Sequence, residues 1–162
     1  GQTRKNFFRG ICMVVNRLFN ITMPDKAYFG EKDYQQLTII KKMVDDLYMP
    51  LEIVSCPIIR DKDGLALSSR NKYLSEEHRK QAPYIYKALC SAKNSFESGE
   101  KSSIKLIEHI SQYLKKYTEI QIDYINIINP KTLRNINYIN KDSHLLFAGY
   151  LGKTRLIDII SF

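Results

Sequence analysis

The strongest constraint on the fold is an alternation of strand-like and helix-like patterns over residues 26–56. Residues 51–56 form a continuous run rich in β-branched side chains, which is typical of a strand buried on both faces of a parallel sheet. Residues 26–29 predict a shorter strand. Between them, apolar side chains recur every three to four residues and predict a helix over residues 33–48, with Leu37, Ile40, Val44 and Leu47 on its buried face. The order strand, helix, strand predicts an α/β fold.

A further helix is expected before the first strand. It would begin near Gly10 and carry Ile11, Val14, Val15 and Leu18 on its apolar face. Two short strands cannot close a core alone, because a parallel sheet needs helices on both faces. We therefore expect residues 1–58 to be the C-terminal part of an α/β domain whose N-terminal half is absent from this chain.

Proline, charged residues and glycine gather over residues 57–64 and indicate a domain boundary. Beyond it, we expect a helix after Ser75 that kinks or restarts at Pro83, and a second helix capped by Ser102 or Ser103. Three strand patterns follow, over residues 120–124 with a change of phase at Ile125 that predicts a bulge, 144–151 and 155–160. Residues 59–162 are therefore predicted to form a small α+β domain with an antiparallel sheet.

Composition limits the classes of partner. The net charge of +8 and the pI near 9.3 favour acidic partners, and the basic cluster over residues 4–17 leaves a nucleic-acid-binding module open as an alternative. No apolar run is long enough to span a bilayer, so no membrane partner is expected. The cysteines lie far apart in apolar settings, which predicts reduced thiols in a cytoplasmic protein: Cys12, Cys56 and Cys90.

A polar cluster over residues 30–36 follows the first predicted strand and opens the helix. A strand-to-helix turn of an α/β sheet is where ligands bind and where free backbone N–H groups favour anions. Lys32 could meet a phosphate, Asp33 a metal ion, and Gln36 a hydroxyl or carboxylate. The alternative is structural, with Asp33 as an ordinary helix N-cap and Lys32 as a solvated residue.

A second polar cluster, residues 67–71, follows the loop of residues 61–64. The hydroxyls of Ser68 and Ser69 beside the guanidinium of Arg70 suit phosphate oxygens, because the planar arginine fork donates paired hydrogen bonds. Taken alone, such a cluster is more often a solvated turn.

The order of these motifs resembles the pantoate-beta-alanine ligase (pantothenate synthetase) family. The matching stretches are residues 8–10 (FRG), 24–37 (PDKAYFGEKDYQQL), 63–74 (DGLALSSRNKYL) and 152–158 (GKTRLID). The resemblance implies the second half of a Rossmann-like, nucleotide-binding nucleotidyltransferase domain over residues 1–58, followed by a C-terminal lid domain over residues 59–162. It also implies an ATP-dependent ligase that condenses D-pantoate and beta-alanine through a pantoyl adenylate, with Mg²⁺, and releases AMP and pyrophosphate.

The resemblance further implies the site residues. Lys32 and Arg70 would be catalytic, Gln36 would hold pantoate, and Asp33 would lie near Mg²⁺. ATP would be bound by nine residues, namely Gly30, Glu31, Lys32, Asp33, Ile59, Leu67, Ser68, Ser69 and Arg70. It implies small-molecule substrates rather than nucleic acid, and a homodimer for the full-length enzyme.

The sequence also departs from the family. The His-x-Gly-His pair that precedes these motifs is absent, and Phe7 stands where the family usually has histidine. We therefore expect the chain alone to be inactive. Another adenylate-forming nucleotidyltransferase stays open as an alternative, because it would share the phosphate-binding residues but not Gln36.

Overall fold

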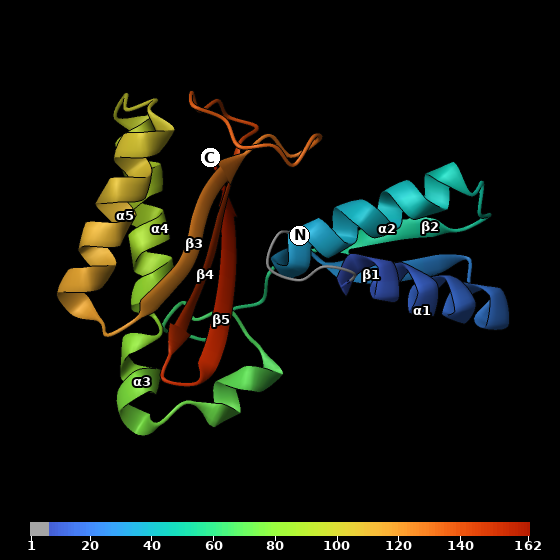
Figure 1. Ribbon diagram of the computed structural model, residues 1–162, viewed down its shortest axis with the longest axis horizontal. Coiled ribbons are helices and arrows are strands. Elements are labelled where there is room, and N and C mark those ends of the chain that lie inside the picture. The colour runs from blue at the N-terminus through green and yellow to red at the C-terminus, as the bar shows by residue number, and fades with distance from the viewer. Residues whose placement is uncertain (1–6) are drawn as a thin grey trace. The chain divides into compact units, whose positions relative to one another are not determined.

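The computed structural model describes residues 7–162, and the chain divides into two compact units, Gly1–Ile58 and Ile59–Phe162 (Figure 1). Arg4 and Lys5 of the basic cluster lie outside the described residues. Each unit has its own buried apolar cluster. Across residues 7–162, no helix combines the length and the apolar character that a membrane crossing requires.

The first unit is built around a βαβ arrangement. Helix α1 (Phe7–Thr22) precedes strand β1 (Lys26–Gly30), the 3₁₀ helix η1 (Glu31–Asp33), helix α2 (Tyr34–Asp46) and strand β2 (Glu52–Cys56). The two strands run parallel, in register from Lys26 opposite Glu52 to Gly30 opposite Cys56. The predicted strand, helix, strand order is confirmed.

The buried face of α2 matches the predicted stripe at Leu37, Ile40 and Val44, whereas Leu47 follows the helix and is exposed. Residues 51–56 were expected to be buried on both faces, and this is wrong for the described structure. No residue of β2 is fully buried, because a two-stranded sheet with the described helices covers its strands incompletely.

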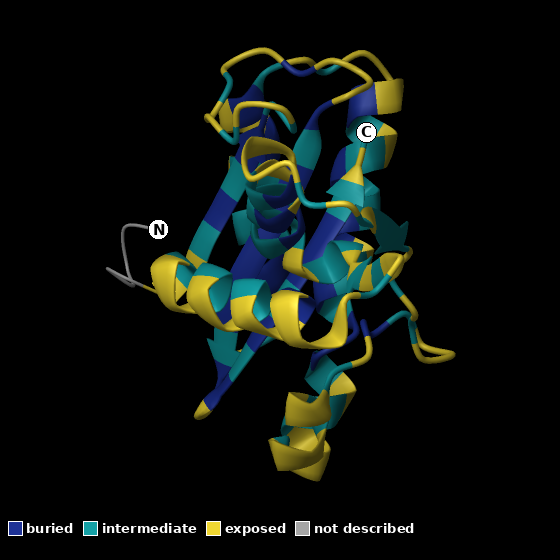
Figure 2. Ribbon diagram, turned by 90° about the vertical axis from the view of Figure 1, so that its right-hand side faces the viewer, coloured by how far each residue is buried: buried dark blue, intermediate teal, exposed yellow. Residues whose placement is uncertain are grey.

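The predicted apolar face of α1 is also partly wrong. Val14 and Leu18 are more than half exposed, and α1 is yellow along much of one side in Figure 2. Phe19 is buried instead, and it packs in one cluster with Ile11, Cys12 and Val15. The contacting stripe is therefore rotated about the helix axis, which places Phe19 rather than Leu18 against Ile40 and Val44.

The second unit is α+β. Its helices are η2 (Ser69–Tyr73), α3 (Glu76–Gln81), α4 (Tyr84–Glu97) and α5 (Ser103–Tyr117), and its strands are β3 (Gln121–Ile128), β4 (His144–Leu151) and β5 (Thr154–Ser161). The strands form an antiparallel sheet in the order β3-β4-β5. Helices α4 and α5 pack beside each other against this sheet (Figure 1). The predicted fold class, an α/β unit followed by an α+β unit with an antiparallel sheet, is confirmed.

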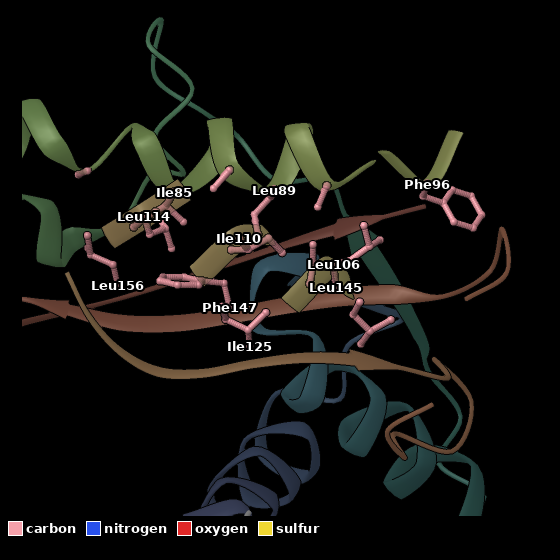
Figure 3. Close-up of a cluster of buried hydrophobic side chains, with 14 of the residues drawn as sticks. Ile85, Leu89, Phe96, Leu106, Ile110, Leu114, Ile125, Leu145, Phe147 and Leu156 are labelled. Carbon is pink, nitrogen blue, oxygen red and sulfur yellow. The ribbon is translucent and has the colours of Figure 1, made fainter. Parts of the chain in front are cut away.

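The core of the second unit lies between α4, α5 and the sheet (Figure 3). Each helix contributes a stripe at helical spacing, and the strands contribute residues from their inward face. The labelled side chains are Ile85, Leu89 and Phe96 from α4, Leu106, Ile110 and Leu114 from α5, and Ile125, Leu145, Phe147 and Leu156 from the strands.

Local signals account for the ends of these elements. The helix predicted after Ser75 does restart at Pro83, where α3 gives way to α4. The hydroxyls of Ser75 and Ser102 accept hydrogen bonds from the backbone N–H groups of His78 and Lys105, so both cap their helices. The bulge in β3 lies between Ile122 and Tyr124, slightly earlier than predicted.

Candidate functional site

The first polar cluster occupies the edge of the parallel sheet where both strands end. Gly30 is the last residue of β1, Glu31–Asp33 form η1, and Gln36 lies in the first turn of α2. In open α/β sheets this is the edge at which ligands bind. The predicted residues Gly30, Glu31, Lys32, Asp33 and Gln36 are thus gathered on one turn of the first unit.

Gly30 is not required by its own backbone. Its φ of −71° and ψ of 136° are extended values that any residue adopts, and an added Cβ would meet no described atom within 4 Å. A glycine with no local steric reason leaves room for another molecule to approach the backbone. The structure therefore gives no local steric reason for glycine at this position, and the role of Gly30 in ATP binding stays a prediction.

Asp33 occupies the N-cap position of α2 without acting as a cap. The η1 turn precedes α2, and the Asp33 side chain makes no capping hydrogen bond. The structural alternative for Asp33, that its carboxylate serves the helix N-terminus, is therefore wrong for this structure. The carboxylate is exposed, and Lys32 beside it is half-buried.

The metal expectation can be tested against the donor set. Among the described residues, no group of three or more histidine, cysteine or acidic side chains could hold a metal ion. Magnesium does not need such a cage, since it keeps several waters and is usually bound by one or two carboxylates together with substrate phosphates. The exposed carboxylate of Asp33 fits this mode of binding, in which the phosphates and waters supply most of the ligands. It does not fit a site made of protein ligands alone.

The second polar cluster is carried by a hairpin of residues 59–67. The Leu67 N–H donates to the Ile59 carbonyl at 2.9 Å, Arg60 and Ala66 form an antiparallel bridge, and the Asp61 N–H donates to the Leu65 carbonyl at 2.8 Å. Ile59 and Leu67 therefore lie opposite each other, and both are more than half exposed. The hairpin brings together two predicted ATP-binding residues that are eight positions apart in sequence.

Residues 68–70 continue from the hairpin into η2. The Ser68 hydroxyl accepts a hydrogen bond from the Arg70 N–H at 3.2 Å and so has a structural role as the cap of η2, which the sequence analysis missed. Its own proton stays available for donation to another oxygen. Ser69 and Arg70 are exposed. Asn71 fixes this turn to the hairpin, because its amide Nδ2 donates to the Ala66 carbonyl at 3.2 Å.

Each unit therefore gathers its own share of the predicted residues. Gly30 to Asp33 and Gln36 lie in the first unit, and Ile59 with Leu67 to Arg70 lie in the second. The prediction that Lys32 and Arg70 meet at one triphosphate stays a prediction.

The structure also contains a polar pair that the sequence analysis did not single out as functional. Arg60, in the hairpin, forms a two-pronged ion pair with Asp158 of β5, at 2.7 Å and 2.8 Å. Arg79 of α3 pairs with Asp61 and Asp63 at the tip of the same hairpin, and its hydrogen bond lowers the pKa of the Asp63 carboxyl. The hairpin is thus tied to the second unit by two arginines.

Comparisons with known proteins agree on one family. The family model described as Pantoate-beta-alanine ligase matches residues 1–161. The pantothenate synthetase of Enterococcus faecalis is 48% identical over 162 residues, which is 100% of this chain and 57% of that protein. That of Thermotoga neapolitana is 44% identical over 158 residues, covering 98% of this chain and 56% of that protein. The chain thus spans just over half the length of these relatives.

Solved structures give the same result. The crystal structure of pantothenate synthetase from Thermus thermophilus superimposes with a TM-score of 0.93 at 41% identity, over 99% of this chain and 58% of that one. The pantoate-beta-alanine ligase of Francisella tularensis, solved in complex with beta-gamma ATP and beta-alanine, has a TM-score of 0.72 at 32% identity and covers 99% of this chain and 52% of that one.

Proposed function

Because this chain belongs to the pantoate-beta-alanine ligase family, we propose that the protein carrying it joins D-pantoate to beta-alanine with ATP as co-substrate. The observation that carries the proposal is the family match over residues 1–161, which takes in both polar clusters. The relative from Francisella tularensis, solved with beta-gamma ATP and beta-alanine, supports the choice of ligands.

The proposed reaction has two steps. The pantoate carboxylate attacks the α-phosphorus of ATP, giving pantoyl adenylate and pyrophosphate. The amine of beta-alanine then attacks the adenylate carbonyl and displaces AMP, giving pantothenate. The first step brings negative charges together, so fixed positive charge near the phosphates stabilises its transition state. We assign this role to Lys32 and Arg70.

The remaining proposed roles follow from residue type and placement. Gly30 lets the nucleotide approach the backbone. Glu31, the next residue, lines the same side of the nucleotide site. Ile59 and Leu67 offer adjacent exposed apolar side chains to the nucleotide, and the hydroxyls of Ser68 and Ser69 donate to phosphate oxygens. The amide of Gln36 hydrogen bonds to pantoate. Catalysis in this scheme is positioning and electrostatics, without a covalent enzyme intermediate.

We propose that Asp33 helps to hold Mg²⁺ together with the phosphates of ATP. The ion would neutralise phosphate charge when bound. The carboxylate suits this role because it is exposed and is not used as a helix cap.

We further propose a cytoplasmic, homodimeric enzyme with no nucleic-acid or membrane partner, built from a nucleotide-binding domain and a C-terminal lid. The wide separation of Cys12, Cys56 and Cys90 in the sequence, each in an apolar setting, supports a reducing compartment. That this chain alone is inactive stays a prediction, which an assay of the 162 residues tests directly.

The decisive experiment is pantothenate formation by the Lys32→Ala variant of the protein as its gene encodes it. We expect kcat to fall by about 10²–10³-fold, as when other charge-stabilising groups are removed from a transition state. Lys42→Ala is the matched control. Lys42 is also a lysine of the first unit, but it lies on α2, where it forms an exposed ion pair with Asp46. Wild-type kcat in Lys32→Ala would overturn the assignment.

Two binding measurements separate the alternatives. Calorimetric titration with ATP and D-pantoate, compared with other carboxylates, distinguishes this ligase from another adenylate-forming enzyme. A gel-shift assay with mixed oligonucleotides at moderate salt tests the nucleic-acid module, which predicts tight and salt-sensitive binding.

A further inference from the structure

The ion pair between Arg60 and Asp158 is one of the most enclosed charged contacts of the second unit. Nη1 of Arg60 lies 2.7 Å from Oδ2 of Asp158, and Nη2 lies 2.8 Å from Oδ1, while the side chains are only 17% and 4% exposed. Paired hydrogen bonds of this kind fix direction as well as distance, because the guanidinium and the carboxylate must lie in one plane.

The guanidinium makes further contacts beyond this ion pair. Nη1 of Arg60 donates to the Gly64 carbonyl at 3.1 Å, and the guanidinium carbon lies 3.7 Å from the centre of the Tyr86 ring. Lysine could not reproduce this arrangement, since an ammonium group has no planar fork to bond both carboxylate oxygens and no flat face to stack on the ring. The site therefore selects arginine specifically.

Asp158 provides a rigid anchor. It lies in β5 opposite Phe147 of β4, and its Oδ1 also accepts a hydrogen bond from the Ile159 N–H at 2.8 Å. Its position is thus set by the antiparallel sheet. The ion pair transmits that position to the hairpin of residues 59–67.

The anchored hairpin is the segment that presents the proposed nucleotide-binding residues. Successive residues of an extended chain point to opposite sides, so fixing the side chain of Arg60 inward directs Ile59 outward. On the facing strand Ala66 is buried and Leu67 is exposed, in the same alternation. Ser68, Ser69 and Arg70 follow directly, so the orientation of the hairpin also sets where η2 begins.

We propose that Arg60 is a positioning residue for ATP: through Asp158 it holds the hairpin of residues 59–67 in the orientation that presents Ile59, Leu67 and the segment of Ser68 to Arg70 to the nucleotide. This inference rests on the proposed function. Arg60 touches neither substrate nor reacting atoms in this scheme and acts through the residues on either side of it.

The test is the steady-state kinetics of Arg60→Lys in the protein as its gene encodes it. We expect the KM for ATP to rise about tenfold. The reason is that a shift of the hairpin by up to about an ångström weakens the contacts that its residues make with the nucleotide. The KM for D-pantoate should stay unchanged, because pantoate is assigned to Gln36 in the other unit. A residue that merely stabilised the fold would not split the two KM values.

Arg155→Lys is the matched control. Arg155 also donates two hydrogen bonds to an aspartate of this sheet, from Nε at 3.1 Å and from Nη2 at 2.7 Å to Oδ2 of Asp123, but it lies on β5 rather than in the hairpin. We expect the KM for ATP to be unchanged in this variant. An equal rise in both variants, or a wild-type KM for ATP in Arg60→Lys, would overturn the proposal.

Asp158→Asn provides a second route to the same test. Asparagine keeps the shape of the side chain but removes the charge that holds Arg60, so we expect the same selective rise in the KM for ATP. Because KM does not depend on the concentration of active enzyme, a variant that is only partly folded still reports on it. If the wild-type protein makes no pantothenate, the proposed function fails. If it does, and either Arg60→Lys or Asp158→Asn keeps the wild-type KM for ATP, this inference alone fails.

Discussion

Gly64 is the position at which a single added methyl group should disturb the hairpin most. Its φ is +94°, a backbone conformation that residues with a Cβ rarely adopt, and an added Cβ would lie 2.7 Å from Cδ1 of Tyr86. That contact is too short for two carbon atoms. The Tyr86 ring also stacks on Arg60, so it cannot move without disturbing the ion pair with Asp158.

Two costs therefore add in Gly64→Ala. The backbone strain of a non-glycine residue in a sparsely populated region costs about 1–3 kcal/mol. Overpacking against Tyr86 costs about another 1–3 kcal/mol. We expect the free energy of unfolding to fall by about 2–6 kcal/mol, a large part of the about 5–15 kcal/mol typical of a folded protein.

Gly99→Ala separates the two costs. Gly99 has a similar φ of +111°, but an added Cβ there would meet no described atom within 4 Å. It should therefore lose only the backbone part, about 1–3 kcal/mol. The measurement is urea unfolding of both variants and the wild type, followed by far-UV circular dichroism. Equal losses in Gly64→Ala and Gly99→Ala would refute the argument that Tyr86 resists the added methyl group.

Two further predictions concern the second unit. Ile110→Ala should lower the free energy of unfolding by about 2–5 kcal/mol, because Ile110 is fully buried in the core of the second unit. Ile104 lies on the same helix but is exposed, so Ile104→Ala should change the free energy of unfolding by no more than about 0.5 kcal/mol. The same urea assay measures both variants. The hydrogen bond from Arg79 lowers the pKa of Asp63. The Asp63 carboxylate therefore stabilises the folded state at pH values above the ordinary aspartate pKa of about 3.9. This contribution is lost as the pH falls through the lowered pKa. Asp63→Asn should therefore be less stable than the wild type at pH 7 and nearly equal to it at the acid end of a pH series, and a stability difference that grows on acidification would contradict this.

The sequence predicted those parts of the fold that depend on local patterns. The stripe at Leu37, Ile40 and Val44 gave the buried face of α2, and Pro83 marked the break between α3 and α4. Both signals come from residues within one or two helical turns, where spacing and backbone restrictions act directly. The error at Val14 and Leu18 has the opposite origin. Helix α1 is apolar over a wide arc, so periodicity alone could not decide which stripe would contact α2.

For the candidate site, the sequence predicted the turns but not what the side chains do there. Asp33 was placed correctly at the start of α2, yet only the structure reveals that η1 precedes it and that its carboxylate makes no capping bond. Ser68 had the reverse outcome, because a residue considered only as a phosphate ligand also caps η2. Capping depends on φ and ψ at one residue, which a sequence pattern does not determine.

The ion pair of Arg60 lay beyond local reasoning because its partner is 98 residues away. The burial of β5 in the structure shows why a partner is needed. Along β5, Thr154, Leu156 and Asp158 are buried at alternate positions, so the carboxylate of Asp158 lies on the inward face of the strand. An inward carboxylate is too costly to leave unpaired, and this requires a cation from elsewhere in the chain. The buried position of Asp158 in β5 thus requires such a partner, and the folded chain identifies it as Arg60, at the base of the hairpin that precedes Ser68, Ser69 and Arg70.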